Sequence, residues 1–323
     1  MQKLMNRYAR TDLALELRED IEDEQPLDGV KIYTKVSDDS DIRETIIKVT
    51  DKKGEKTLGK PIGTYITLES DMLRRSDEGI HEPFVHVLHR HLKKMIGSAQ
   101  KILVIGLGNR AVTPDALGPY VVDNLYITRH LLTEGIVHNV RELSAISPGV
   151  MAQTGIETQL ILKSLCQEID PDVVIAVDAL AAREPSRLNS TIQICDTGIS
   201  PGAGVGNNRG QINQDTLGVK VIAIGVPTVI SVPSIVNQSI EAMVNALMQG
   251  RREERGASDE QADNEQPEEK GFKMLLTDEE KYELACELVE PALASMFVTP
   301  KNIDEAVKRV SYTISEAINR FFE

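Results

Sequence analysis

KILVIGLGNRAVTPDALGP, residues 101–119, and PDVVIAVDALAAR, residues 171–183, are the two stretches that decide the fold class. Each contains an apolar run typical of a buried parallel strand, and beyond each run stands one aspartate among small residues, Asp115 or Asp178. In an open α/β sheet, ligands bind in the crevice beyond the carboxyl ends of parallel strands. The two stretches therefore predict an active site built on paired carboxylates.

Apolar runs and helical patterns alternate on both sides of these stretches. The predicted strands are 101–106, about 137–144, 173–178, 191–196 and 219–226, and the predicted helices are 80–97, about 116–133, 149–168, 233–249 and 302–322. This alternation predicts an α/β fold, a largely parallel twisted sheet with helices on both faces. Before it, VKIYTKV, RETIIKVTD and IGTYITLES alternate apolar and polar residues, which predicts a small N-terminal antiparallel β subdomain.

Composition suggests how the chain is divided. The stretch 251–271 carries many charges and no aliphatic residue larger than alanine, so it cannot offset its ordering entropy by burial and is expected to be a disordered acidic loop. The expected parts are a propeptide (1–12), an N-terminal leader and small β subdomain (13–78), the α/β catalytic core (79–250), the disordered acidic loop (251–271) and C-terminal helices packed on the core (272–323).

Charge and cysteine usage exclude several classes of protein. The formal net charge of -14 argues against nucleic-acid binding, which needs a basic face. Three cysteines without a CxxC spacing argue against a disulfide framework and favour a reducing, cytoplasmic compartment. The sequence shows neither the apolar core of a signal peptide nor a stretch that could span a membrane, and no cofactor or metal is expected.

Two other motifs and one cysteine allow weaker functional interpretations. GLGNRA, residues 106–111, formally satisfies a dinucleotide-binding fingerprint, but Pro114 interrupts the helix that should follow. GISPG, residues 198–202, resembles a nucleophile elbow, but Pro201 after Ser200 has no N–H for an oxyanion hole. Cys195 ends an apolar run and is interpreted as a packing residue. A nucleotide-binding protein remains the alternative from another class.

Four of the six histidines, His81, His86, His89 and His91, lie in the predicted helix 80–97. They lack the spacing of a zinc helix and are interpreted as a solvated face. The two aspartates also have structural interpretations, Asp115 as a helix cap and Asp178 as a turn former.

Four motifs in order, GLGNRAVTPDALGP, SAISPGVMAQTGIET, VVIAVDALAAR and RLNSTIQICDTGISPGAGVGNNR, resemble the germination protease family of endospore-forming bacteria. The resemblance implies an endopeptidase that initiates degradation of small acid-soluble spore proteins, with Asp115 and Asp178 as its essential aspartates. It also implies a fold similar to hydrogenase maturation endopeptidases, in which a histidine after a Ser-Pro pair binds metal with two acids. Because Gly202 stands at that position, an aspartic-type mechanism is favoured, and a metal-dependent processing enzyme is the alternative.

The resemblance further implies a zymogen that removes a short N-terminal segment, and substrates cut after an acid in the pattern acid, Ile/Phe/Leu, Ala, small residue, Glu. The leader sequence Asp-Leu-Ala-Leu-Glu, residues 12–16, resembles such a substrate, which predicts self-cleavage between Asp12 and Leu13. Recognition of an acid needs a cation, and Arg110, Arg183 and Arg209 are the predicted substrate-binding residues, unless they are ordinary surface arginines. The family also implies a homotetramer in the spore core.

Overall fold

The computed structural model describes residues 11–19, 27–36, 41–75, 78–202, 210–240, 242–243, 287, 289 and 291–322. The chain divides into two compact units. The larger comprises Thr11–Ala182, Ser186–Val229 and Thr299–Glu323, and the smaller comprises Met1–Arg10, Arg183–Pro185 and Ile230–Val298. Asp115, Asp178 and the predicted cleavage residues Asp12 and Leu13 all belong to the larger unit.

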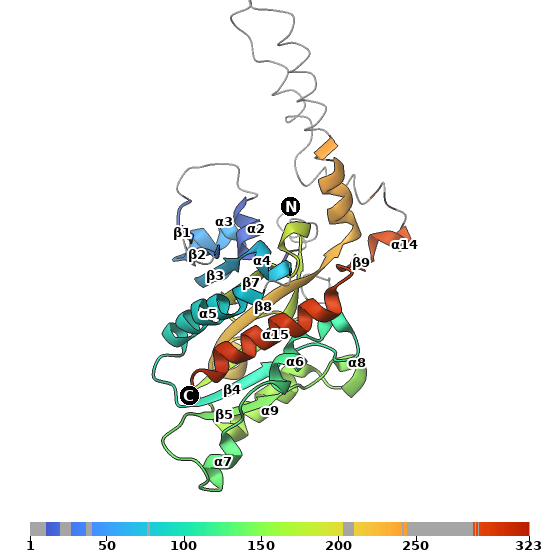
Figure 1. Ribbon diagram of the computed structural model, residues 1–323. Coiled ribbons are helices and arrows are strands. Elements are labelled where there is room, and N and C mark those ends of the chain that lie inside the picture. Colours follow the sequence, from blue (N-terminus) through green and yellow to red (C-terminus); the bar gives the residue numbers. More distant parts are fainter. Residues whose placement is uncertain are drawn as a thin grey trace, which may run out of the picture. The chain divides into compact units, whose positions relative to one another are not determined.

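One mixed sheet runs through the described residues (Figure 1). Its strand order is β1-β2-β3-β7-β8-β6-β4-β5, and β9 pairs with β8. The strands are β1 (Val30–Val36), β2 (Arg43–Val49), β3 (Gly63–Glu69), β4 (Lys101–Gly106), β5 (Glu142–Ile146), β6 (Val173–Ala182), β7 (Thr191–Cys195), β8 (Lys220–Ser231) and β9 (Phe297–Val298).

The prediction of a largely parallel sheet is wrong. Strand β4 pairs in parallel with β5 and β6, but the pairs β1–β2, β2–β3, β3–β7 and β7–β8 are antiparallel. Strands β7 and β8 are buried on both faces, so their continuous apolar sequences look like those of parallel strands. The meander β1 to β3 is present, but it continues the main sheet through the β3–β7 pairing, so a separate N-terminal subdomain is not confirmed.

Helices cover both faces of the sheet. Alternate residues of β4 point to opposite sides: Ile102 and Val104 join the cluster that includes α5, α6 and α15, whereas Leu103 and Ile105 join the cluster of α9 and α10. Helix α15 packs along α5 and α6 (Figure 1). The helices of the larger unit are α2 (Ala14–Glu19), α3 (Lys52–Leu58), α4 (Asp71–Arg74), α5 (His81–Ile96), α6 (Leu117–Asp123), α7 (Arg129–Thr133), α8 (Met151–Thr154), α9 (Thr158–Ile169), α10 (Gln214–Leu217) and α15 (Ile303–Asn319). Its 3₁₀ turns include η1 (Glu78–Ile80), η2 (Thr113–Asp115) and η3 (Pro185–Arg187), the last of which begins in the smaller unit.

Two predicted helices are broken. The pattern at 116–133 forms α6 and α7, and the pattern at 149–168 forms α8 and α9, because Gly155 ends α8 with a left-handed backbone (φ 70°). The smaller unit contains α14 (Pro291–Ala294) and a helical segment at 232–240. The predicted acidic loop 251–271 lies outside the described residues. None of the described helices has the length and apolar character that crossing a membrane requires.

The histidines of α5 do not form one solvated face. His86 is exposed as predicted, but His91 is buried, and its Nε2 lies 2.8 Å from Oε2 of the buried Glu44 on β2. His81 and His89 hydrogen-bond to residues of α15. Apolar spacing predicts the helix, but it does not predict which polar side chains of that helix are buried.

Candidate active site

Asp178 lies inside β6, just past the point where its neighbour β4 ends. Gly106, the last residue of β4, is paired with Val177, so Asp178 is the first residue of β6 beyond that pairing. The predicted strand 173–178 ends too early, because β6 has β8 as its other neighbour and continues past Asp178 to Ala182. Asp178 is 4% exposed, and its Oδ1 accepts a hydrogen bond from the Ala179 N–H at 2.9 Å.

Asp115 is the last residue of the turn η2, which follows the loop after β4. Its Oδ2 accepts a hydrogen bond from the Asn109 N–H at 2.7 Å, and the residue is half-buried. The turn η2 packs against β6, the strand that carries Asp178. The two predicted carboxylates therefore come from elements that contact each other near the carboxyl end of β4.

Glycines allow the backbone to close around Asp115. Gly108 has φ 111°, and a Cβ there would lie 1.9 Å from the Asp115 carbonyl oxygen. A Cβ at Gly118, in the first turn of α6, would lie 2.5 Å from the Leu107 nitrogen and 2.6 Å from the Val177 oxygen. The Leu107 N–H donates to that same oxygen at 2.8 Å. The glycine motif therefore serves close packing of η2 and α6 against the sheet, and the amides of Leu107 and Asn109 already have partners within the protein.

Asn109 joins two loops of the site and was not among the residues predicted from the sequence. Its side-chain Oδ1 accepts hydrogen bonds from the Ala111 N–H at 3.0 Å and from Nε2 of Gln153, in α8, at 2.7 Å. Its own N–H donates to Asp115. Asn109 thus positions the Asp115 carboxylate. Its location in the sequence, between the end of the predicted strand 101–106 and Asp115, is the signal that could have identified it as a site residue.

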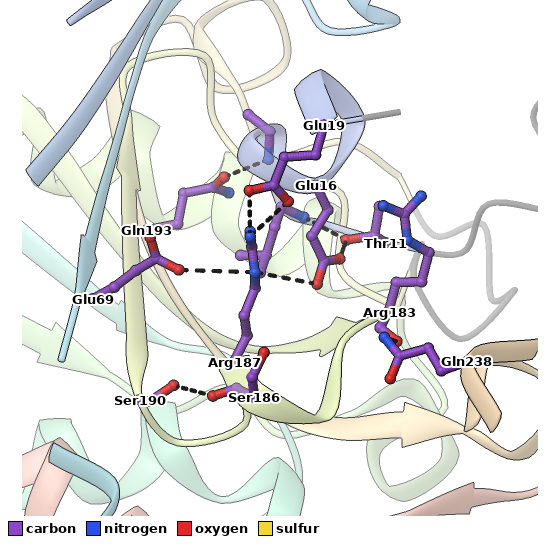
Figure 2. Close-up of polar contacts among 12 residues, drawn as sticks. Thr11, Glu16, Glu19, Glu69, Arg183, Ser186, Arg187, Ser190, Gln193 and Gln238 are labelled. Carbon is purple, nitrogen blue, oxygen red and sulfur yellow. Dashed lines mark hydrogen bonds and ion pairs between the residues drawn. The ribbon is translucent and has the colours of Figure 1, made fainter. Parts of the chain in front are cut away.

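The three predicted arginines have different outcomes. Arg110 is paired with Asp123 of α6 at 2.7 Å, and this hydrogen bond is the main cause that raises the pKa of Arg110 and lowers the pKa of Asp123. Arg183 belongs to the smaller unit, where its carbonyl oxygen accepts from Gln238 Nε2 at 3.4 Å (Figure 2). Arg209 lies outside the described residues. Their roles in substrate binding stay predictions.

The predicted cleavage residue Asp12 is bound to β6. The Asp12 N–H donates to the Ala181 oxygen at 3.2 Å, and the Ala181 N–H donates to Asp12 Oδ2 at 3.0 Å. In a parallel sheet, alternate residues direct their backbone groups to the same neighbour. Val177 bonds to Leu107 on the β4 side, so Ala181, an even number of residues later, points to that side too. The leader therefore lies on the edge of β6 just past the end of β4.

The peptide bond between Asp12 and Leu13 is held from both ends. The Asp12 carbonyl oxygen accepts hydrogen bonds from Lys60 Nζ at 3.0 Å and from Gln193 Nε2 at 3.2 Å. The Oε1 of the same Gln193 side chain accepts the Ala14 N–H at 2.7 Å, and Leu13 between them is fully buried. One side-chain amide thus fixes the register of the leader.

A buried arginine contacts the leader a few residues further along (Figure 2). The Arg187 side chain is 8% exposed, and its Nη2 lies 2.6 and 2.7 Å from the two carboxylate oxygens of Glu19. Its Nε lies 3.8 Å from carboxylate oxygens of Glu16, on α2, and of Glu69, on β3. We call Glu16, Glu19, Glu69 and Arg187 the Arg187 cluster. Sequence reasoning missed it because Arg187 lies in the short turn η3 and Glu19 is 168 residues away in the sequence.

Cys195 is buried beneath α2 and α3, and burial raises the pKa of its thiol. This environment agrees with the predicted packing role. In the described part of the chain, no group of three or more His, Cys, Asp or Glu side chains is arranged to hold a metal ion.

Comparison with known proteins finds relatives over nearly the whole chain. The family model described as germination protease matches residues 9–323. A relative named germination protease in Caldanaerobacter subterraneus subsp. tengcongensis is 42% identical over 317 residues, which cover 96% of this chain and 93% of that protein. Proteins of the same name in Clostridium perfringens and Bacillus pumilus are 40% and 37% identical, and each match covers 96% of this chain and 94% or 92% of the relative.

Among solved structures, a [NiFe] hydrogenase maturation protease, HycI from Thermococcus kodakarensis KOD1, matches with a TM-score of 0.27 and 17% identity. The match covers 43% of this chain and 80% of that one. A likeness at this level supports no argument about function.

Proposed function

The chain belongs to the germination protease family, a family of peptidases, and from that membership we propose that it is a sequence-specific endopeptidase which initiates the degradation of small acid-soluble spore proteins. In this proposal it cuts after an acidic residue and is made as a zymogen that removes residues 1–12 itself. It acts in the spore core as a homotetramer.

The proposed chemistry is aspartic-type hydrolysis by Asp115 and Asp178. Two carboxyl groups that share a site hold one proton between them, since like charges close together cannot both ionise cheaply. The ionised carboxylate takes a proton from water while the water oxygen adds to the peptide carbonyl carbon. The protonated partner donates its proton to the carbonyl oxygen, which gives a tetrahedral diol. The carboxyl group that took the proton from water then passes it to the amide nitrogen, one diol hydroxyl returns a proton to the other carboxylate, and the C–N bond breaks to give a carboxylic acid and an amine.

One observation carries this proposal: the leader's Asp12 is hydrogen-bonded to Ala181 on β6, the strand that holds Asp178 and packs against the turn that holds Asp115. A segment whose sequence resembles the substrate is thus bound on the strand that supplies one proposed catalytic acid. The hydrogen bonds to the Asp12 carbonyl oxygen from Lys60 and Gln193 are of the kind that orients a peptide for cleavage.

The alternative of a nucleotide-binding protein is less favoured, because the Leu107 N–H in the glycine motif donates to the Val177 oxygen and the Asn109 N–H donates to Asp115. The metal-dependent alternative shares both aspartates and differs in what a chelator should do. A bound metal would lower the pKa of its water and replace one acid in that role. The two mechanisms are therefore separated by experiment.

Replacing each aspartate tests the proposal directly. Asp115→Asn and Asp178→Asn keep an oxygen that can accept the hydrogen bond from Asn109 or Ala179, so the fold should be preserved. Each change should lower cleavage of a purified small acid-soluble spore protein by about 10²- to 10⁴-fold. Asp71→Asn is the matched control, because Asp71 is an exposed aspartate paired with Arg74.

Intact mass of the full-length chain gives a second measurement. Active protein should lose residues 1–12 and begin at Leu13, and both active-site variants should retain Met1. Undiminished cleavage by either variant would reject the assignment of that aspartate. Inhibition by a chelator, reversed on adding a divalent metal, would favour the metal-dependent mechanism, whereas a start other than Leu13 would reject the cleavage position.

A further inference from the structure

Gln193 stands in the middle of β7 and binds the leader with its side chain. It is 7% exposed, and it is paired with Thr67 on β3 and with Gly225 on β8. Its side-chain Nε2 donates to the Asp12 carbonyl oxygen at 3.2 Å, and its Oε1 accepts the Ala14 N–H at 2.7 Å. A carbonyl can only accept and an N–H can only donate, so one orientation of the amide satisfies both contacts. The amide therefore matches this stretch of backbone in polarity as well as in position.

The two contacts repeat the hydrogen bonding of a parallel β ladder. In such a ladder, one residue donates to the carbonyl before its partner residue and accepts from the N–H after it. Here the Gln193 side chain takes the place of that residue, and Leu13, between Asp12 and Ala14, takes the place of its partner. Because both hydrogen bonds go to backbone atoms, this pairing fixes the position of the chain and not the identity of its side chains.

Gln193 and Asp178 lie on the same face of the sheet. Residues paired across neighbouring strands point to one face, so the Gln193 side chain points to the face on which a Cβ at Gly225 would lie. That Cβ would be 2.3 Å from the Leu180 side chain. Leu180 and Asp178 are two residues apart on β6, so their side chains share a face. The amide that binds the leader and one proposed catalytic acid therefore face the same side of the sheet.

We propose that Gln193 is a substrate-positioning residue that decides which peptide bond of the leader is cut. The inference rests on the proposed function, because it takes the bond after Asp12 as the scissile bond. The Gln193 amide binds the carbonyl of that bond and the second N–H beyond it, while the Asp12 N–H donates to Ala181 on β6. Holding the chain at these points limits which carbonyl carbon the activated water can reach. The leader is already in place in the full-length chain, so no contact has to open for this role.

Self-cleavage of purified full-length protein, followed by intact mass, tests the proposal. Gln193→Met keeps a side chain of similar length and removes both hydrogen bonds. We expect the chain that begins at Leu13 to form roughly 10- to 100-fold more slowly, because two hydrogen bonds are lost while Lys60 still donates to the Asp12 oxygen. Products that begin at neighbouring residues should appear beside it. Slower cleavage at an unchanged position would show a purely structural role and would overturn the proposal.

Ala14→Pro tests the same contact from the side of the leader. Proline has no N–H for Gln193 to accept, and Ala14 is the first residue of α2, where proline is tolerated. This change should slow cleavage by about 3- to 10-fold. In the Gln193→Met background it should cost clearly less, because the hydrogen bond is already absent. Ala14→Gly removes the methyl group but keeps the N–H, so it should retain the cleavage position. An equal loss from Ala14→Pro in both backgrounds would overturn the contact.

Gln100→Ala is the matched control, because Gln100 is an exposed glutamine whose Nε2 also donates to a backbone oxygen, that of Ser98. It should keep the wild-type rate and position of cleavage. Circular dichroism checks that each variant folds, and if Gln193→Met does not, the two Ala14 variants decide the question.

The outcomes separate this inference from the proposed function. An unchanged rate and product in Gln193→Met, or a wild-type product that does not begin at Leu13, would overturn the role of Gln193 and leave the proposed endopeptidase intact. A wild-type chain that stays full length, or an Asp178→Asn chain that is shortened as fast as the wild type, would overturn the proposed function and this inference together.

Discussion

Glu44 and Glu16 are both buried glutamates that face an arginine, but they belong to different kinds of structure. Glu44 lies on β2 and accepts from Arg90 Nη2 at 2.5 Å and His91 Nε2 at 2.8 Å, both on the sixteen-residue helix α5. Glu16 lies on the six-residue helix α2 next to the leader and contacts Arg187. The same pairing of charges therefore appears once inside the core and once on a short terminal segment.

The difference lies in what happens when the pairing is lost. Strand β2 is hydrogen-bonded to β1 and β3, and α5 contributes many of its residues to the main apolar core, so Glu44 and its partners cannot separate without wider unfolding. Helix α2 has only six residues, and Ala14 and Leu15 join a separate apolar cluster, so we expect its contact with Arg187 to be lost by local release at a lower cost. Three predictions follow from this contrast, in order of expected effect.

The largest effect is expected at Glu44. In Glu44→Ala, the cationic Arg90 and the imidazole of His91 lose their shared acceptor inside the core. Breaking a buried pair by removing one partner typically costs about 3–5 kcal/mol, so the free energy of unfolding should fall by that amount. Urea unfolding followed by circular dichroism measures it. A loss below about 1 kcal/mol would show that this cluster is as dispensable to the fold as an exposed ion pair.

An intermediate effect is expected on acidification. Burial lowers the pKa of His91 below its ordinary value of 6.5, despite the opposing hydrogen bond to Glu44. Burial alone would raise the pKa of Glu44, but hydrogen bonds from Arg90 and His91 bring it below its ordinary 4.5. Both depressed values mean that the unfolded chain binds protons more readily. For His91 this stabilisation is present above pH 6.5 and is lost as the pH falls from 6.5 through the lower pKa of the folded state. For Glu44 the corresponding loss begins at pH 4.5 and ends below its lowered folded-state pKa.

Unfolding measured between about pH 7.5 and about pH 5.5 should show this loss of stability in the wild type, and His91→Gln should flatten the dependence. Arg74→Gln, which removes an exposed ion pair with Asp71, should leave the slope over this range unchanged. An equal slope in His91→Gln and the wild type would assign the pH dependence to other groups.

The smallest effect on global stability is expected at Glu16. In Glu16→Gln, we expect residues 11–19 to detach locally, so that Arg187 does not stay buried without its Glu16 partner. The free energy of unfolding of the whole protein should then change by less than about 1 kcal/mol. Limited proteolysis within residues 11–19 should nevertheless become faster, while cleavage elsewhere does not. A loss as large as that of Glu44→Ala would mean that α2 is a permanent part of the core, and the contrast would disappear.

Local sequence patterns were sufficient for most elements. The meander strands β1, β2 and β3 begin within one residue of the alternating patterns that predict them, and α5 lies within the predicted helix 80–97. Periodicity is a local property, and each of these elements buries one clear face. The end of α8 at Gly155 has a local cause, a glycine in the left-handed conformation, which the apolar spacing alone did not indicate. The continuation of β6 past Asp178 depends on its neighbour β8, so the pattern did not predict it.

For this protein, the sequence alone determined the alternation of strands and helices, the two candidate aspartates and the substrate-like leader, because these are features of consecutive residues. The tertiary structure alone decided which strands pair antiparallel, that Asn109 holds Asp115, and that Arg187 meets Glu16. The physical reason is that a strand edge or a buried charge takes its partner from whatever packs against it. Which partner that is depends on how backbone and charged groups are buried throughout the fold, so the spacing of neighbouring residues in the sequence does not predict it.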